Sequence, residues 1–241
     1  MNQTWVAIVA LTAAACGSGD AGQIRQQPPP GATVASPPRD TTARSTPPVP
    51  RIVVLGDSLT AGLGLPASQS YPTLLQQRLN DAGLRYEVVN AGVSGDTSAG
   101  GLSRLEWALQ GDVRILIVAL GGNDALRALP VEELKQNLAE IIERAQARGI
   151  TVILAGMEAP TNWGREYDLA FHKVYPALAE EFHAPLIPFL LKDVAGIERL
   201  NQSDGIHPTA AGARIVADNV WAILRPAAER EQQKRAPRGG S

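Results

Sequence analysis

At 241 residues the chain has room for one domain of ordinary size, and an apolar fraction of 44% is enough for a hydrophobic core. A net charge of -2 provides no broad positive field, which argues against nucleic acid as a partner. The single cysteine, Cys16, and three histidines without an H-E-x-x-H spacing exclude thiol catalysis and cysteine metal sites from the body of the chain, and no metal is expected.

The N-terminus begins with an apolar run, residues 5–15, that is shorter than the ~20 residues a membrane-spanning helix needs. Such a run followed by small residues is typical of a signal peptide. The ending Ala-Ala-Ala-Cys-Gly also resembles a bacterial lipoprotein signal, in which Cys16 would be lipidated. We therefore expect residues 1–16 to be a lipoprotein-type signal peptide of an exported bacterial protein, periplasmic or membrane-anchored. Ordinary cleavage after Ala15, or a cytosolic start, stays open.

Residues 17–50 contain eight of the 18 prolines and almost no periodic apolar residues. Such a segment buries too little surface to offset the entropy lost on ordering, so we expect an extended, disordered tether. A tether between a lipidated cysteine and a folded domain is consistent with an anchor. The domain itself is predicted to span residues 51–225.

Apolar runs alternate with amphipathic segments along this domain. Strands are predicted at residues 52–55, 86–90, 113–120, 150–155 and 185–188. Helices are predicted at residues 70–82, 97–109, 132–148, 168–182 (broken near Pro176) and 209–224, the last ending at Pro226 before a polar tail over residues 226–241. The alternation indicates an α/β fold with a parallel sheet between two helix layers.

Three of the predicted strands end in polar turns that contain glycine. They are Gly56-Asp57-Ser58, Ser94-Gly95-Asp96 and Gly121-Gly122-Asn123-Asp124. Because the carboxyl ends of parallel strands meet at one edge of a sheet, Ser58, Gly95 and Asn123 are expected to converge there.

A fourth segment, Asp204-Gly205-Ile206-His207-Pro208, precedes the last helix. Asp and His three residues apart in a tight turn place a carboxylate beside an imidazole, and Pro208 keeps His207 out of the helix. This pattern predicts nucleophilic catalysis, with Ser58 as nucleophile, His207 as base and Asp204 as its orienting partner. The N–H groups of Ser58 and Gly95 and the Asn123 amide would be the oxyanion donors.

These four segments resemble, in order and type, the four motif blocks of the SGNH (GDSL) hydrolases. The flanking residues 90–98 and 179–186 are similar to the bacterial arylesterase, acyl-CoA thioesterase and lysophospholipase subgroup. The resemblance covers residues 51–224. It implies a flavodoxin-like three-layer αβα sandwich with about five parallel strands in the order 2-1-3-4-5, the same catalytic and oxyanion residues, and no cofactor. It favours a small acyl ester or lysophospholipid as substrate. Separately, we expect a monomer, although the sequence does not determine the oligomeric state.

Other polar residues have simpler interpretations. His172 and His183 are expected to be surface or packing histidines, and three aspartates are expected to accept hydrogen bonds from turn amides: Asp57, Asp96 and Asp124. Three residues after the fourth predicted strand are candidates to line an acyl pocket, with ordinary loop packing as the alternative: Pro160, Trp163 and Tyr167.

Two other functions stay open. A carbohydrate acetylesterase would use the same groups, because substrate choice depends on the loops. A tethered binding module would use the glycine turns to hold a phosphate or nucleotide, although G-x-x-x-x-G-K-[ST] is absent. The G-x-S-x-G motif of the α/β-hydrolases is absent as well.

Overall fold

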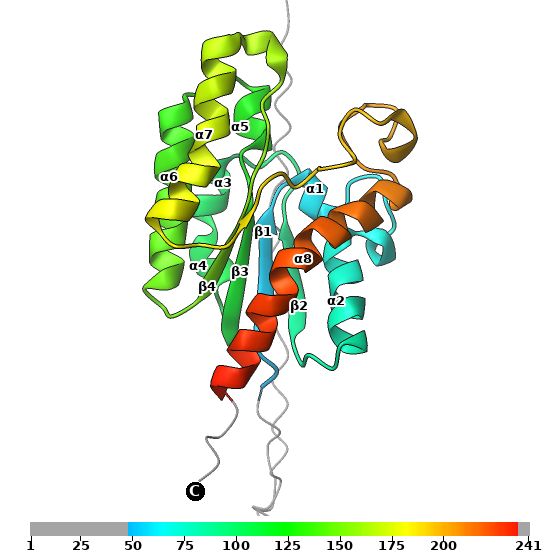
Figure 1. The fold of residues 1–241 in the computed structure, drawn as a ribbon, viewed down its shortest axis with the longest axis vertical. Helices are drawn as coiled ribbons and strands as arrows, with labels where there is room; N and C mark the ends of the chain where they lie inside the picture. Colours follow the sequence, from blue (N-terminus) through cyan, green and yellow to red (C-terminus); the bar gives the residue numbers. More distant parts are fainter. Residues whose placement is uncertain (1–47, 236–241) are drawn as a thin grey trace, which may run out of the picture. The chain divides into compact units, whose positions relative to one another are not determined.

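The structure is a computed structural model that describes residues 48–235. Within this range, five strands form one parallel sheet in the order β2-β1-β3-β4-β5 (Figure 1). The strands are β1 (Arg51–Gly56), β2 (Glu87–Gly92), β3 (Val113–Ala119), β4 (Thr151–Ala155) and β5 (Leu186–Ile187). The predicted parallel sheet and its strand order are confirmed.

Helices cover both faces of this sheet (Figure 1). On one face α2 (Tyr71–Asp81) packs against α8 (Ala210–Arg235), and on the other α6 (Val131–Gln146) packs against α3 (Ser98–Ser103) and α7 (Arg165–Glu181). The apolar side chains of α6 recur at helical spacing and are buried: Leu134, Leu138, Ile141, Ile142 and Ala145. The predicted three-layer αβα sandwich is therefore confirmed.

Three neighbouring strands, β2, β1 and β3, end level with one another at their carboxyl ends. Gly56, the last residue of β1, pairs with Gly92 of β2 and with Ala119 of β3. Residues 52–55 of β1 are fully buried, so a shift in this register would disturb the core on both faces. The register therefore brings the turns after β1, β2 and β3 to one edge of the sheet.

Helices near this edge differ from the prediction. Two short helices were not predicted: α1 (Ser58–Ala61) follows β1 directly, and α5 (Gly122–Leu126) begins just after β3. The predicted helix over residues 97–109 is divided into α3 and α4 (Leu105–Ala108), because the backbone at Arg104 leaves helical geometry. Paired glycines at 100 and 101 weaken the helix before this point.

Prolines do not interrupt the last two long helices, contrary to the prediction. α7 continues through Pro176, and α8 continues through Pro226 to Arg235, so the predicted polar tail is helical for its first ten residues. Tertiary contacts stabilise this extension, since Tyr86 donates a hydrogen bond to the Ala228 carbonyl (3.0 Å) and Thr151 donates to Glu231 (2.9 Å). These contacts outweigh the local cost of proline.

The first described residues, 48–50, belong to the predicted tether. Pro50, predicted to belong to the tether, is buried, and its carbonyl accepts a hydrogen bond from the Glu87 N–H. The predicted signal peptide, residues 17–47 of the predicted tether and residues 236–241 lie outside the described residues. None of the helices within residues 48–235 has the length and apolar character needed to cross a membrane.

Arg104 connects the carboxyl ends of two strands to the turn after β2. Its Nε donates to Asp96 Oδ2 (2.6 Å), Nη1 to the Ala91 carbonyl (2.8 Å) and Nη2 to the Gly56 carbonyl (2.9 Å). The side chain is 17% exposed, so these charge-assisted bonds are largely shielded from water. One guanidinium thus fixes how the β1 and β2 ends lie relative to the turn that contains Gly95.

We expect Arg104→Met to lower the free energy of unfolding by about 2–4 kcal/mol, because it removes three hydrogen bonds and leaves Asp96 as a partly buried, unpaired carboxylate. Urea denaturation followed by circular dichroism measures this change. Arg225→Met is the matched control, since Arg225 forms an exposed i,i+4 pair with Glu229 and should cost less than about 1 kcal/mol. Equal effects of the two substitutions would contradict the role assigned to Arg104.

Candidate active site

Ser58 lies at the first position of α1, directly beyond β1. Asp57 caps this helix by accepting a hydrogen bond from the Leu59 N–H at 3.0 Å, and Gly62 ends it in the left-handed conformation. Glycine is required at position 56, where a Cβ would lie 2.0 Å from Thr60 Oγ1. The tight passage from strand to helix therefore presents the Ser58 hydroxyl at the edge of the sheet.

The segment before α8 brings an imidazole and a carboxylate to the same place. His207 Nε2 lies 2.8 Å from Ser58 Oγ, although the two residues are 149 positions apart. His207 Nδ1 lies 2.6 Å from Asp204 Oδ2. The three side chains predicted from the sequence to act together thus form a continuous chain of hydrogen bonds.

Backbone donors hold the Asp204 carboxylate in place. Its Oδ1 accepts hydrogen bonds from the Ile206 N–H (2.9 Å) and the His207 N–H (3.0 Å). These bonds, from His207 first and Ile206 second, lower the pKa of Asp204 to about 2. Asp204 is therefore ionised at neutral pH and faces the ring nitrogen of His207 with a full negative charge.

Asp57 has the opposite pKa shift. Burial raises its pKa to about 6, although hydrogen bonds from the Leu59 N–H and the Asn123 amide, together with the nearby His207, oppose the increase. The protonated form of Asp57 is therefore favoured more strongly in the folded than in the unfolded state. The contribution of this group to the free energy of unfolding is present at low pH and is lost as the pH rises from about 4 to about 6. Its Oδ2 lies 3.2 Å from Asn123 Nδ2, which links the turn after β1 to α5.

The other predicted oxyanion donors lie in the turns after β2 and β3. Asn123 is part of α5 and lines the same cleft as Ser58 and His207. Gly95 lies outside the lining of this cleft, in the turn from Val93 to Asp96. It has a φ of 85°, and its carbonyl accepts a hydrogen bond from Arg127 at 2.9 Å. Within residues 48–235 the N–H groups of Ser58 and Gly95 donate no hydrogen bond, so both are available to a ligand.

The cleft beside Ser58 has a volume of about 370 Å³ and a mainly apolar lining. Its apolar side chains come from α1, α5 and the segments after β4 and β5: Leu59, Leu126, Met157, Ala159, Pro160, Phe189, Leu191, Ala195 and Ile206. Of these, the sequence predicted only Pro160. The other residues after β4 and β5 could have been found from their position, because they follow strands that end at the same sheet edge.

Two residues predicted as possible pocket residues lie elsewhere. Trp163 is exposed at the end of a short 3-10 helix (Thr161–Trp163). Tyr167 donates a hydrogen bond to the Leu129 carbonyl and stacks on Phe171 with the ring centroids 6.2 Å apart. Neither side chain lines the cleft: Tyr167 packs on Phe171, whereas Trp163 is exposed to solvent.

The remaining polar predictions are confirmed in most respects. Asp124 accepts hydrogen bonds from the Ser98 N–H (2.8 Å) and hydroxyl (2.5 Å), which holds α5 against α3. Asp96 binds the Arg104 guanidinium instead of a turn amide, a correction to the prediction. His172 and His183 are both exposed.

Within the described range no three His, Cys, Asp or Glu side chains are grouped so that they could hold a metal.

Comparison with known proteins identifies the family of the chain. Residues 54–215 match the GDSL-like Lipase/Acylhydrolase family. The chain is 47% identical over 176 residues to Esterase TesA of Pseudomonas aeruginosa, covering 73% of this chain and 88% of that protein. It is 39% identical over 176 residues to Thioesterase 1/protease 1/lysophospholipase L1 of Escherichia coli, covering 73% and 83% respectively.

The fold of this chain is also similar to that of a solved esterase structure. The psychrotrophic esterase EstA from Pseudoalteromonas sp., inhibited by monoethylphosphonate, superimposes with a TM-score of 0.70 at 30% identity, covering 73% of this chain and 97% of EstA. The chain therefore belongs to the GDSL-like lipase/acylhydrolase family, the SGNH hydrolases, and is an enzyme that hydrolyses ester bonds.

Proposed function

We propose that the enzyme is a serine esterase that hydrolyses carboxylic esters and thioesters through an acyl-enzyme on Ser58. The observation that supports this most directly is the hydrogen-bonded series from Ser58 Oγ through the His207 ring to Asp204, with distances of 2.8 and 2.6 Å. It meets the requirement that a nucleophile, its base and the group that orients the base lie within direct reach of one another.

Acylation begins when His207 Nε2 accepts the Ser58 proton as the hydroxyl oxygen attacks the ester carbonyl. The ionised Asp204 stabilises the imidazolium that results and holds it in the correct tautomer. When the tetrahedral intermediate collapses, the imidazolium returns the proton to the departing alcohol or thiol. The acyl group then remains on Ser58.

Three donors stabilise the negative charge on the carbonyl oxygen in this mechanism. They are the Ser58 N–H, the Gly95 N–H and the Asn123 side-chain amide. The two backbone groups donate no hydrogen bond within the described residues, and Asn123 uses one of its two amide hydrogens toward Asp57. Donors arranged before the reaction need no reorganisation when the charge develops.

Deacylation repeats these steps with water. His207 removes a proton from a water molecule, which attacks the acyl carbonyl, and the same donors hold the second tetrahedral intermediate. Its collapse breaks the bond to Ser58 Oγ, and His207 returns the proton to the serine. The acid is released and the enzyme is restored.

The cleft lining supports an acyl chain as the bound part of the substrate. Apolar side chains from four separate segments can shield a hydrocarbon chain from water. The relatives named as an esterase and as a thioesterase and lysophospholipase are consistent with this substrate class. No particular feature of the cleft favours a carbohydrate ester.

Ser58→Ala is expected to abolish covalent labelling by a fluorophosphonate and to reduce kcat on p-nitrophenyl octanoate by at least about 10³-fold, because no other group replaces the nucleophile. Labelling is measured by intact-protein mass spectrometry. Ser103→Ala, which changes an exposed serine on α3, is the control and should label like the wild type. A labelled Ser58→Ala protein, or an unlabelled wild type, would rule out the proposed nucleophile.

Asn123→Ala is expected to lower kcat on the same ester by about 10²–10³-fold, which corresponds to the loss of one oxyanion donor at about 3–4 kcal/mol. KM should change by less than about threefold, since the donor acts mainly in the transition state. Steady-state kinetics separate the two parameters. Asn80→Ala, an exposed change on α2, should alter neither. A purely higher KM would argue against an oxyanion role.

We also propose that the protein is exported and anchored through a lipidated Cys16. The support is the small-small-Cys ending of the apolar leader and the proline-rich segment that follows it. The domain is joined to this segment at Pro50, before β1, whereas Ser58 follows the opposite end of that strand. An anchor attached there would leave the cleft accessible.

Cys16→Ser in the full-length chain, expressed in a bacterium, is expected to move the protein from the membrane fraction to the soluble fraction. Loss of the acylated thiol removes the hydrophobic chains that bind the bilayer. Fractionation followed by immunoblotting measures the change. If the wild-type protein is already found in the soluble fraction, lipidation is not its anchor.

A further inference from the structure

The cleft beside Ser58 contains an exposed carboxylate that the proposed mechanism does not use. Glu158 lines the cleft in the segment after β4, and its side chain is 37% exposed. None of the described residues that line this cleft is Lys or Arg. Among the described lining residues, His207 is therefore the one basic group that accompanies Glu158 and the buried Asp57.

The other two carboxylates of the site, Asp57 and Asp204, accept hydrogen bonds from backbone N–H groups, whereas Glu158 accepts none from the backbone of the described residues. Asp57 is buried and accepts hydrogen bonds from the Leu59 N–H and the Asn123 amide. Asp204 accepts two backbone N–H bonds and faces His207. Glu158 has one partner in the described structure, His172 Nδ1, which lies 3.0 and 3.1 Å from its two carboxylate oxygens.

We infer that Glu158 is a specificity-determining residue that makes the enzyme prefer uncharged acyl esters to esters with an anionic leaving group. This inference rests on the proposed esterase function and narrows its substrate class. It predicts that, for one acyl group and one kind of leaving atom, a neutral leaving group is preferred to one that carries a carboxylate or phosphate. The residue acts through its charge and takes no part in proton transfer.

Charge at Glu158 acts on the leaving group as well as on the acyl chain, because the leaving group is bonded to the carbonyl carbon beside Ser58, and Ser58 lines the same cleft as Glu158. Glu158 and the bound substrate share a cavity of about 370 Å³, whose linear dimension (the cube root of the volume, roughly 7 Å) is below the Debye length of about 8 Å at physiological salt. At such a distance and an intermediate effective dielectric constant, one unit charge changes a binding or rate constant by about three- to tenfold.

The pair between Glu158 and His172 contributes little to the stability of the fold. His172 is 62% exposed, and pairs between such exposed side chains contribute little to folding. Glu158→Gln keeps the shape of the side chain and removes only its charge. A folded variant is therefore available for the test.

The experiment compares two octanoyl esters that differ by one carboxylate on the leaving group: o-nitrophenyl octanoate and 4-nitro-3-octanoyloxybenzoate. The measured quantity is the ratio of kcat/KM for the neutral ester to that for the anionic ester at low ionic strength. Glu158→Gln is expected to lower this ratio about three- to tenfold relative to the wild type, chiefly by raising kcat/KM on the anionic ester. Glu158→Lys should lower it further.

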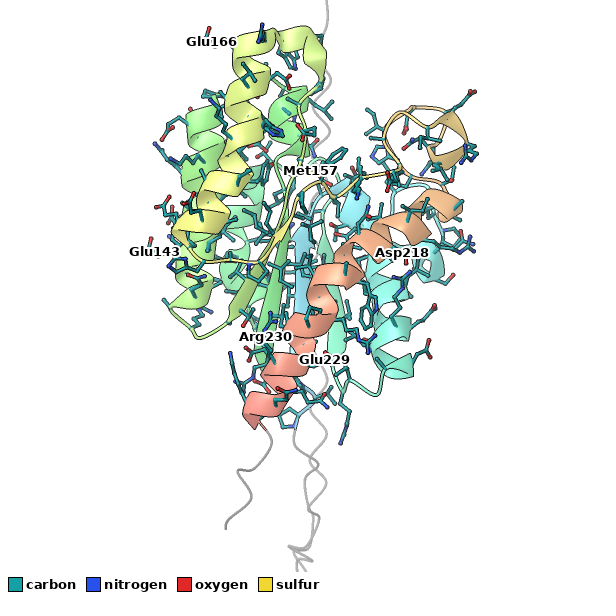
Figure 2. All side chains as sticks on the ribbon, viewed as in Figure 1. Glu143, Met157, Glu166, Asp218, Glu229 and Arg230 are labelled. Carbon is teal, nitrogen blue, oxygen red and sulfur yellow. The ribbon has the colours of Figure 1, made fainter. Side chains whose placement is uncertain are left out.

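Glu166→Gln is the matched control, since Glu166 is exposed in the first turn of α7 and does not line the cleft. Figure 2 labels Glu166 at the N-terminal end of α7, well away from Met157, which precedes Glu158 in the chain. This variant should keep the wild-type ratio. Added salt should lower the ratio for the wild type and leave that of Glu158→Gln nearly unchanged.

An unchanged ratio in Glu158→Gln, or an equal change in Glu166→Gln, would overturn the inference. Failure of the proposed function gives a different result, because the wild type would then hydrolyse neither ester or Ser58→Ala would hydrolyse both. The charge effect and the esterase activity are therefore tested separately.

Discussion

The active-site edge depends on three parallel strands that end level with one another and on the Arg104 guanidinium that joins two of them. Gly56, Gly92 and Ala119 lie side by side in the sheet, and Arg104 binds the carbonyls of Gly56 and Ala91. The Gly56 carbonyl also accepts a hydrogen bond from the Val93 N–H (3.0 Å), and because a carbonyl oxygen has two lone pairs, a five-donor guanidinium can add bonds to several strand-end carbonyls at once. The turns that hold Ser58 and Gly95 are thereby set on a rigid base.

Two aspartates at this edge illustrate how surroundings determine the behaviour of one residue type. Burial raises the pKa of Asp57, whereas backbone N–H donors lower that of Asp204. In the proposed mechanism only Asp204 needs to be ionised, since it faces the imidazole that becomes positively charged. Asp57 caps α1 through one carboxyl oxygen, which accepts a hydrogen bond from the Leu59 N–H, and holds Asn123 through the other.

In the proposed mechanism, the residues that choose the substrate differ from those that support catalysis. The proposed catalytic and oxyanion groups lie on the turns after β1, β2 and β3 and before α8, while much of the apolar lining, together with Glu158, lies on the segments after β4 and β5. Loops of this kind can change without disturbing the sheet. The family fold and the proposed chemistry are thus compatible with different ester preferences in different members.

The sequence by itself determined the alternation of strands and helices, the parallel sheet, and the four segments that meet at its edge. These features depend on local periodicity and turn chemistry, which a linear chain displays directly. The tertiary structure alone decided that α8 continues past Pro226, that Arg104 divides a predicted helix, and that Glu158 lines the cleft while Trp163 and Tyr167 do not. Each of these depends on which distant groups become neighbours after folding, because packing and hydrogen bonds between remote segments override local preference.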